Sequence, residues 1–286
     1  SKMRTTIRVG DVEITAIADK AHDFNPGFHF PSVDPEAWEP YSDLIEGPEG
    51  YVLVNFHCFL IRNGSQTVLI DTGWGPELGP PGAPKERGAL MGDLEGLGVE
   101  PGDIDVVAFT HLHADHVGWN LVYEDEKILP RFTSARYLVS EPDWAFFSAR
   151  EENHPNIAQQ AIPLDEIGVL DTFNDGHLLT PFLTAEATPG HTPGHMSFVV
   201  QSSGERLYIL GDLIHHPVIA HETDWVHKFD ADPEMAVATR KKVLERLERE
   251  ETTVAAGHLQ HPSFGRFARV DGRRVWKPID VGPSLG

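Results

Sequence analysis

Apolar and polar residues alternate near the start of the chain in the pattern of β-hairpins. The segment "TTIRVGDVEITAIAD", residues 5–19, alternates on both sides of Gly10-Asp11, which predicts two strands joined by a tight turn. The segment "YVLVNFHCFLIRNGSQTVLIDTG", residues 51–73, contains two apolar runs separated at Asn63-Gly64, where a turn with positive φ is expected. The first part of the chain is therefore predicted to form two hairpins.

Helical and strand-like patterns alternate along the rest of the chain. Helical spacing predicts a short helix carrying Leu90, Leu94 and Leu97, a helix over 141–152 and a longer one over 230–251. In the longest helix Asp232 suits the N-cap and Pro233 suits the first turn. Short apolar runs predict strands at 103–110, 135–140, 182–187, 197–201, 206–210 and 252–258. Strands and helices in this mixed order favour a single α/β (α+β) domain over residues 1–286.

Three segments lack a clear period. Residues 22–50 are rich in Pro, Gly and aromatic residues, and residues 75–88 read "GPELGPPGAPKERG". We expect both to be active-site loops, and residues 153–178 to be rich in loops. Residues 1–3 are interpreted as partly a tag remnant, with a native start at Met3.

Composition narrows the classes of function. The chain has 44 acidic and 23 basic residues, and its formal charge of −21 would repel nucleic acid, so no nucleic-acid partner is expected. A single cysteine excludes an internal disulfide framework, and no stretch approaches the roughly 20 apolar residues that span a membrane. The polar start is unlike a secretory leader, so we expect a cytoplasmic enzyme without a membrane partner.

The segment "AFTHLHADHVGWN", residues 108–120, places three histidines and an aspartate directly after an apolar run. In an extended segment His111 and His113 point the same way and can bind one metal, while Asp115 and His116 can reach a neighbouring site. Two metals about 3.5 to 4 Å apart can hold a hydroxide between them and polarise a substrate oxygen. The pattern H-x-H-x-D-H therefore predicts a dinuclear metal site.

Two metal sites need more than four ligands, and the sequence provides further candidates after other apolar runs. His191 lies in "TPGHTPGH", Asp212 follows "RLYIL" in "LGD", and His258 ends "TVAAGH". Neutral imidazole and carboxylate ligands suit zinc. The expected cofactor is two Zn²⁺ ions, with manganese, iron or cobalt as alternative divalent metals.

These motifs resemble those of the metallo-β-lactamase-fold hydrolases. "LIDTG" with Asp71, "THLHADHVG", "TPGHTPGH", "LGD" and the final "GH" occur in the family's order over nearly the whole chain. The overall pattern is most similar to quorum-quenching N-acyl homoserine lactonases and related organophosphate hydrolases. The resemblance implies a four-layer αβ/βα sandwich, with two mixed β-sheets flanked by helices and metals at one edge.

The resemblance also implies a role for each motif residue. The first metal would be held by His111, His113 and His191, the second by Asp115, His116 and His258, with Asp212 as the bridge. Asp71 is expected to orient a ligand histidine. Similar lactonases often have a tyrosine three residues beyond the bridging aspartate, whereas this chain has His215, which is expected to bind substrate or carry a proton. The predicted catalytic residues are therefore Asp115, Asp212 and His215.

Other residues have less specific interpretations. We expect His22, His29, His154 and His177 to be solvated loop residues, His195 to lie in a turn or behind the ligands, and Cys58 to be a small buried hydrophobe. His221, His227 and His261 are left open between pocket and surface. The pocket walls would come from Phe24, Phe28, Phe30, Trp38, Trp119, Trp144, Phe146, Phe147 and Trp225, although any one of these is more typical of a core.

The favoured function is hydrolysis of a small ester or lactone by a metal-bridging hydroxide. Relatives that reduce oxygen or nitric oxide have glutamate where this chain has His113, and they carry a flavin domain that this chain has no room for. Phosphotriesters and β-lactams are alternative substrates for the same site. A nuclease, a glyoxalase II or a protein with a purely structural metal is less favoured. Similar hydrolases are often dimers, so a homodimer is one expectation that no sequence feature selects.

Overall fold

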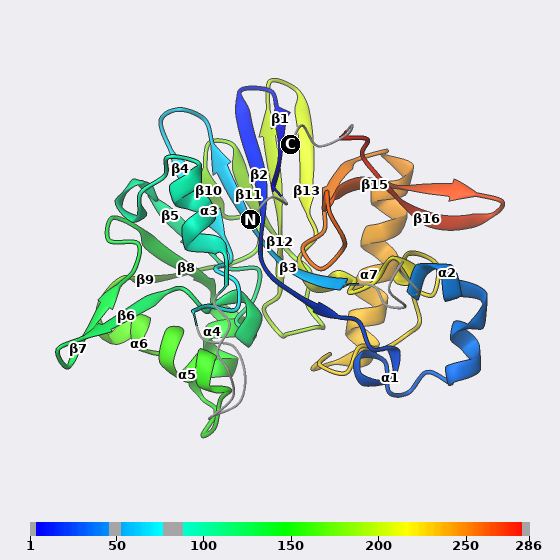
Figure 1. The fold of residues 1–286 in the computed structure, drawn as a ribbon, viewed down its shortest axis with the longest axis horizontal. Helices are drawn as coiled ribbons and strands as arrows, with labels where there is room; N and C mark the ends of the chain where they lie inside the picture. The colour runs from blue at the N-terminus through cyan, green and yellow to red at the C-terminus, as the bar shows by residue number, and fades with distance from the viewer. Residues whose placement is uncertain (1–3, 46–52, 77–87, 282–286) are drawn as a thin grey trace.

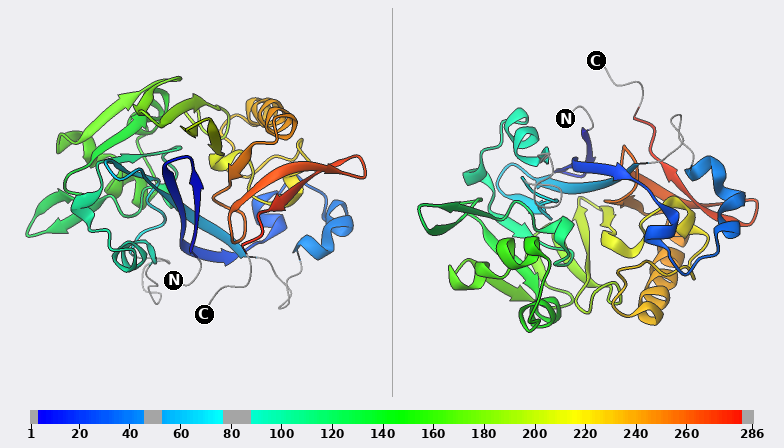
Figure 2. Two further views of the ribbon diagram at one scale, coloured as in Figure 1. Left: turned by 90° about the horizontal axis from the view of Figure 1, so that it is seen from above. Right: turned by 60° about the horizontal axis from the view of Figure 1, so that its bottom comes forward.

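The computed structural model describes residues 4–45, 53–76 and 88–281. Its strands form two seven-stranded sheets and a small separate hairpin (Figures 1 and 2). Within the described residues, no helix combines the length and the apolar character needed to cross a lipid bilayer. Most of the predicted loop at 75–88 lies outside the described residues.

The first sheet has the order β1-β2-β3-β4-β5-β8-β9. Its strands are β1 (Arg4–Val9), β2 (Val12–Asp23), β3 (Leu53–Arg62), β4 (Thr67–Ile70), β5 (Val106–Ala108), β8 (Arg136–Ser140) and β9 (Leu170–Phe173). The first four strands pair antiparallel, whereas β4, β5, β8 and β9 run parallel. The separate hairpin consists of β6 (Leu121–Glu124) and β7 (Lys127–Pro130).

The second sheet has the order β10-β11-β12-β13-β14-β15-β16. Its strands are β10 (Leu178–Thr180), β11 (Leu183–Ala187), β12 (Met196–Ser202), β13 (Glu205–Ile209), β14 (Thr253–Ala255), β15 (Phe264–Val270) and β16 (Arg273–Pro278). Only β13 and β14 pair in parallel, with α7 (Pro233–Arg249) on the connection between them. Both sheets are therefore mixed, as predicted.

Three apolar clusters define four layers. The middle cluster lies between the two sheets and includes Phe59 and Ile61 of β3 with Phe198 of β12. Strand residues alternate between faces, so Cys58 and Leu60 of β3 enter a second cluster instead. That cluster packs the first sheet against α3 (Leu90–Gly96), α4 (Glu141–Ser148), α5 (Pro155–Gln160) and α6 (Pro163–Glu166). The third packs the second sheet against α7, on the opposite side of the molecule in Figure 1, which confirms the αβ/βα sandwich.

Local sequence signals account for the confirmed elements. Val9 pairs with Val12 across the turn at Gly10-Asp11, and the second hairpin turns at Asn63-Gly64. The predicted short helix corresponds to α3 and the helix over 141–152 to α4. In α7 the Asp232 side chain accepts a hydrogen bond from the Met235 N–H at 3.0 Å, as its N-cap position predicts.

Two segments that were expected to be loops contain short helices and strands. Residues 22–45 contain the end of β2, α1 (Pro26–His29), a 3₁₀ helix (Pro35–Tyr41) and α2 (Ser42–Ile45), because Phe24, Phe30 and Trp38 are buried in the third cluster. Residues 153–178 contain α5, α6 and β9, which are too short for a periodic pattern to reveal. Residues 46–50 of the first region lie outside the described residues.

The predicted ligands follow strand ends from both sheets. The motif at 111–116 follows β5, His191 lies between β11 and β12, Asp212 follows β13, and His258 follows β14. Parallel neighbours end at the same edge of a sheet, so β4 and β5 in one sheet and β13 and β14 in the other deliver their following loops together. The sandwich therefore gathers these segments at one edge.

The cap of α7 gives a test of the fold that is independent of the ligands. We expect Asp232→Ala to lower the free energy of unfolding by about 1 kcal/mol, because the Met235 N–H loses its acceptor. Asp232→Asn keeps a side-chain oxygen and serves as the matched control. Urea unfolding measures both variants, and equal stability of the alanine and asparagine variants would contradict the assigned cap.

Candidate metal centre

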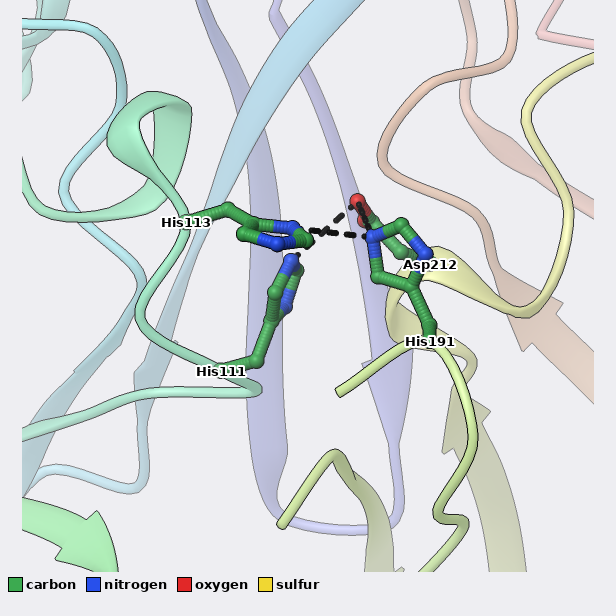
Figure 3. A group of neighbouring side chains, drawn as sticks. All are labelled: His111, His113, His191 and Asp212. Atoms are coloured by element: carbon green, nitrogen blue, oxygen red, sulfur yellow. Dashed lines mark hydrogen bonds and ion pairs between the residues drawn. The ribbon is translucent and has the colours of Figure 1, made fainter. Parts of the chain in front are cut away.

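The structure brings all seven predicted ligands together. Figure 3 shows His111 and His113 entering from one loop and His191 and Asp212 from two others, with their polar atoms converging. His111, His191, Asp212 and His258 are buried, and His113 and Asp115 keep some exposure. Donors from four separate segments therefore meet at one place.

One carboxylate oxygen lies at the centre of this arrangement. Asp212 Oδ2 is 3.3 Å from Nε2 of both His111 and His116. The same oxygen lies 3.2 Å from His191 Nε2 and 3.0 Å from His258 Nε2. A single side chain therefore borders both halves of the ligand set.

The donors fall into two groups that share Asp212. The first group comprises His111, His113, His191 and Asp212, and the second comprises Asp115, His116, Asp212 and His258. Within each group the ligand atoms lie within 4.8 Å of one another. This grouping matches the division that the family resemblance implies, with Asp212 common to both groups.

Four of the histidines are oriented through their second ring nitrogen. His116 Nδ1 lies 2.7 Å from Asp71 Oδ2, and His191 Nδ1 lies 2.7 Å from Asp230 Oδ1. His258 Nδ1 is 2.8 Å from the Asn55 carbonyl oxygen, and His111 Nδ1 is 3.0 Å from the Thr110 hydroxyl. Each partner fixes one ring nitrogen and leaves Nε2 directed at Asp212, which is the arrangement typical of metal-binding histidines.

Asp71 has the orienting position that the sequence predicts. Besides His116, its carboxylate accepts hydrogen bonds from the Thr110 N–H and hydroxyl at 2.8 and 2.7 Å. Its φ of 61° is in the left-handed region, which Asp and Asn adopt more readily than most residues. Asp71 thereby links the end of β4 to the histidine motif.

A second buried carboxylate joins the two histidine loops of the first group. Asp143 of α4 accepts hydrogen bonds from the Leu112 N–H at 3.1 Å and the Gly194 N–H at 2.7 Å. Burial raises the pKa of Asp143 to about 6, although these hydrogen bonds oppose the shift. Asp143 therefore holds the loop of His111 and His113 against the loop of His191.

His195 lies behind Asp212, as one of its two interpretations predicted. Its Nε2 accepts a hydrogen bond from the Asp212 N–H at 2.9 Å, and its Nδ1 lies 2.8 Å from the Thr188 hydroxyl. Gly211 has a φ of 64°, and a Cβ there would lie 2.5 Å from His195 Nε2. Glycine is therefore required for this close approach.

Burial and neighbouring carboxylates shift the pKa values of the predicted ligand histidines in opposite directions. Burial lowers the pKa of His111 and His113 well below the usual range. Burial acts the same way on His116, but the carboxylates of Asp115, Asp212 and Asp71 outweigh it and hold the pKa of His116 well above its usual value. Because a metal ligand must be a neutral imidazole, binding of a cation would displace the proton that the raised pKa keeps on His116.

The donors fit divalent cations. Nε2 of His111 and of His116 are buried and have no hydrogen-bond partner among the described residues. Buried nitrogens without a hydrogen-bond partner destabilise the folded protein. Each of these two lies 3.3 Å from Asp212 Oδ2, and a bound cation would give both nitrogens a partner. Imidazole with carboxylate is a donor set that zinc prefers.

A third group of histidines does not fit a shared ion. His191, His215 and His227 also place ring nitrogens within 4.8 Å of one another. However, the rings of His215 and His227 are stacked, with centroids 3.6 Å apart and planes 10° apart. A cation bound at about 2.0–2.1 Å lies near the plane of each imidazole ligand, so two stacked rings cannot both bind it without rotating.

The structure corrects the interpretation of two histidines and leaves two as expected. His29 is only 7% exposed and packs against His227, and His22 is half-buried within β2, so neither is a solvated loop residue. His154 and His177 are exposed. Cys58 is fully buried, as predicted.

The remaining open residues and aromatic side chains divide between core and surface. His227 is buried beside the ligands, His221 is exposed and His261 is half-buried. Of the aromatic pool, the buried core members are Phe24, Phe30, Trp38, Trp119 and Phe147. Phe28 is 47% exposed, and Trp144, Phe146 and Trp225 are half-buried.

Two polar residues at the centre, Asp143 and Asp230, were not predicted from the sequence, and His227 was left open between pocket and surface. Asp143, Asp230 and His227 lie in segments without a metal-binding motif, and only folding brings them to the ligands. Asp230 follows His227 in a tight turn that no periodic pattern marks. A single sequence offers no signal for such partners.

Comparisons with known proteins agree with this geometry. The chain is 26% identical over 185 residues to N-acyl homoserine lactonase AttM of Agrobacterium fabrum, a match covering 61% of this chain and 65% of AttM, which is less than two thirds of that protein. The structure of hydrolase AbOPH in the beta-lactamase superfamily matches with a TM-score of 0.82 and 26% identity, covering 98% of each chain. The dizinc quorum-quenching lactonase AidC has a TM-score of 0.85 at 22% identity, covering 99% of this chain and 100% of AidC, and this likeness concerns the fold.

The family model extends these similarities to most of the chain. The model of the metallo-beta-lactamase superfamily matches residues 20–272, a range that includes every residue of the two ligand groups. With the four-layer sandwich and the motif order, this match confirms the resemblance seen in the sequence. The chain belongs to the metallo-beta-lactamase superfamily.

Proposed function

We propose that this protein is a dinuclear metal-dependent hydrolase that cleaves a small ester or lactone. The observation that carries the proposal is the position of Asp212 Oδ2, which lies within 3.3 Å of imidazole nitrogens from both ligand groups. A structural zinc site needs four ligands and is closed by them. Here seven predicted ligands form two groups with Asp212 in both, which favours two cations and a catalytic role.

Two bound divalent cations, with zinc as our first choice, would supply Lewis acidity toward a carbonyl oxygen and an activated water-derived nucleophile. His111, His113 and His191 would hold one cation, and Asp115, His116 and His258 the other. The carboxylate of Asp212 lies between the two groups, where its negative charge offsets repulsion between dications. The orienting partners Asp71 and Asp230 keep two of the imidazoles aligned.

His215 provides a neutral polar group beside the ligands. Its Nε2 lies 3.3 Å from Asp212 Oδ2, and its ring is 6% exposed. Burial lowers the pKa of His215 to about 4, so the ring is uncharged at neutral pH. We assign it to donating a hydrogen bond to a substrate oxygen or to carrying a proton, in the position where similar lactonases often have tyrosine.

Apolar surface next to the centre supports an apolar substrate. Phe28 and Phe229 are 47% and 49% exposed, and their rings meet edge to face with the ring centroids 6.2 Å apart. The Phe229 ring also lies 6.3 Å from that of His113. An acyl chain or other apolar group beside the scissile bond would cover these rings, in keeping with the acyl-homoserine lactones named for AttM.

A side-by-side substrate screen tests the bond that is cleaved. We expect the zinc-loaded protein to open acyl-homoserine lactones and cleave aryl esters faster than paraoxon-like phosphotriesters or carbapenems. The measurement is kcat/KM for each class with the same enzyme preparation. Higher values for phosphotriesters or β-lactams would replace the proposed substrate class, and no turnover of any class would remove the hydrolase proposal.

Substitution of the shared carboxylate tests the assignment of the bridge. Asp212→Ala should lower the metal content and abolish nearly all turnover, because both ligand groups lose a member. His215→Ala is the neighbouring comparison, and it should keep the metal while altering kcat or substrate preference. Elemental analysis and steady-state kinetics measure both variants. An active, fully loaded Asp212→Ala protein would refute the bridge, and unchanged kinetics in His215→Ala would refute its role.

Asp71 provides a test of metal affinity that does not depend on turnover. Asparagine can adopt the left-handed backbone at position 71, but Asp71→Asn removes the negative charge that orients His116, so zinc affinity should fall by roughly 10- to 100-fold. Competition with a chromophoric chelator measures this affinity. Asp171→Asn, at an exposed pair with Arg136, is the control and should bind zinc as tightly as the wild type. Equal affinity of Asp71→Asn and wild type would contradict the orienting role.

A further inference from the structure

Three buried histidines outside the predicted ligand set form a column beside the centre. His215, His227 and His29 are 6%, 4% and 7% exposed. Nε2 of His215 points toward Asp212, and the His227 ring stacks on the His215 ring. His29 contacts Nε2 at the edge of the His227 ring. Burying three imidazoles costs free energy of folding unless their polar atoms form hydrogen bonds or other favourable contacts.

The contact between the first two rings is closely parallel. The centroids of His215 and His227 lie 3.6 Å apart and their planes differ by 10°. The His215 ring is also stacked with that of His258, at a centroid distance of 5.1 Å and an angle of 20° between the planes. His215 is therefore stacked with both a predicted ligand ring and His227.

Hydrogen bonds fix the orientation of His227. Its Nδ1 accepts a hydrogen bond from the Phe229 N–H at 3.3 Å, so the proton of the neutral ring is on Nε2. Nε2 then donates to His29 Nδ1, also at 3.3 Å. Because both ring nitrogens of His227 are engaged, this ring cannot flip or rotate freely.

The backbone around His227 is also tied to the centre. The His227 N–H donates to Asp230 Oδ2 at 3.0 Å, while Asp230 Oδ1 orients His191. The Lys228 N–H donates to the His29 carbonyl oxygen at 2.7 Å, which docks α1 onto the same turn. The turn at 227–230 therefore positions His227 relative to the predicted ligands.

We propose that His227 is a positioning residue whose ring face holds the His215 imidazole in its orientation toward Asp212. His29 supports this function by accepting the Nε2–H of His227, and the Phe229 N–H secures the opposite nitrogen. His227 acts through His215, touching neither substrate nor the reacting atoms. The catalytic consequence rests on the proposed hydrolase function, because it requires that His215 meet the substrate.

A matched pair of substitutions isolates the ring face. His227→Phe and His227→Leu both remove the two hydrogen bonds of His227, but only phenylalanine retains a flat ring for His215 to stack on. On the best substrate of the loaded enzyme, His227→Leu should lower kcat by roughly 10- to 100-fold, as expected for a displaced reacting group, with zinc content unchanged. His227→Phe should retain more of kcat. His177→Leu, at an exposed position outside the centre, is the control.

A double-mutant cycle tests whether His227 acts through His215. In a His215→Ala background, adding His227→Leu should cause little further loss of kcat, because the ring that it positions is already gone. The proposal is overturned if the losses multiply, if His227→Leu keeps wild-type kcat, if His227→Phe loses as much as His227→Leu, or if His227→Leu loses zinc.

An NMR readout separates this proposal from the proposed function. In ¹⁵N-histidine-labelled, zinc-loaded protein without substrate, the His215 ring signals should shift and broaden in His227→Leu and stay sharp in His227→Phe. Sharp, unshifted His215 signals in His227→Leu would overturn the positioning role. If the wild type opened no ester or lactone, the hydrolase proposal would fail, and these spectra would still decide whether His227 positions His215.

Discussion

The structure of the site depends on the crowding of imidazole nitrogens around one buried carboxylate oxygen. Nitrogens of His111, His116, His191 and His258 all lie within 3.3 Å of Asp212 Oδ2. So many polar atoms, gathered away from water, carry a large desolvation cost. Two divalent cations between them would satisfy the nitrogens and balance the carboxylates. The four-layer sandwich makes this possible, because strand ends from both sheets deliver their loops to the same edge.

The orienting groups behind the ligands come from several layers of the fold. Asp71 follows β4, Asp143 lies in the first turn of α4, and Asp230 precedes α7. Each joins a ligand or its loop to a different secondary-structure element, so the packing of the sandwich and the alignment of the imidazoles depend on each other. The column of His215, His227 and His29 adds three buried rings beside the predicted ligands His191 and His258.

The sequence predicted those parts of the molecule that local patterns determine. The hairpins at Gly10 and Asn63 and the capped helix after Asp232 depend on neighbouring residues, and each was confirmed. The ligand candidates were identifiable because H-x-H-x-D-H packs several donors into six positions, and their companions follow apolar runs. The strands β15 and β16 were not predicted. Residues 22–45 were misjudged because buried aromatics, and no periodic pattern, order that segment. Asp230 contacts His191 and His227 contacts His215 across separations in the chain that a single sequence does not reveal.

We propose that these seven side chains bind two cations in each chain. The most direct measurement is the metal-to-protein ratio of the wild-type protein, determined by elemental analysis after zinc loading and removal of excess metal by gel filtration. Two zinc ions per chain are predicted. A ratio of one or none would contradict this proposal, because the two groups of ligands that share Asp212 are expected to hold one zinc ion each.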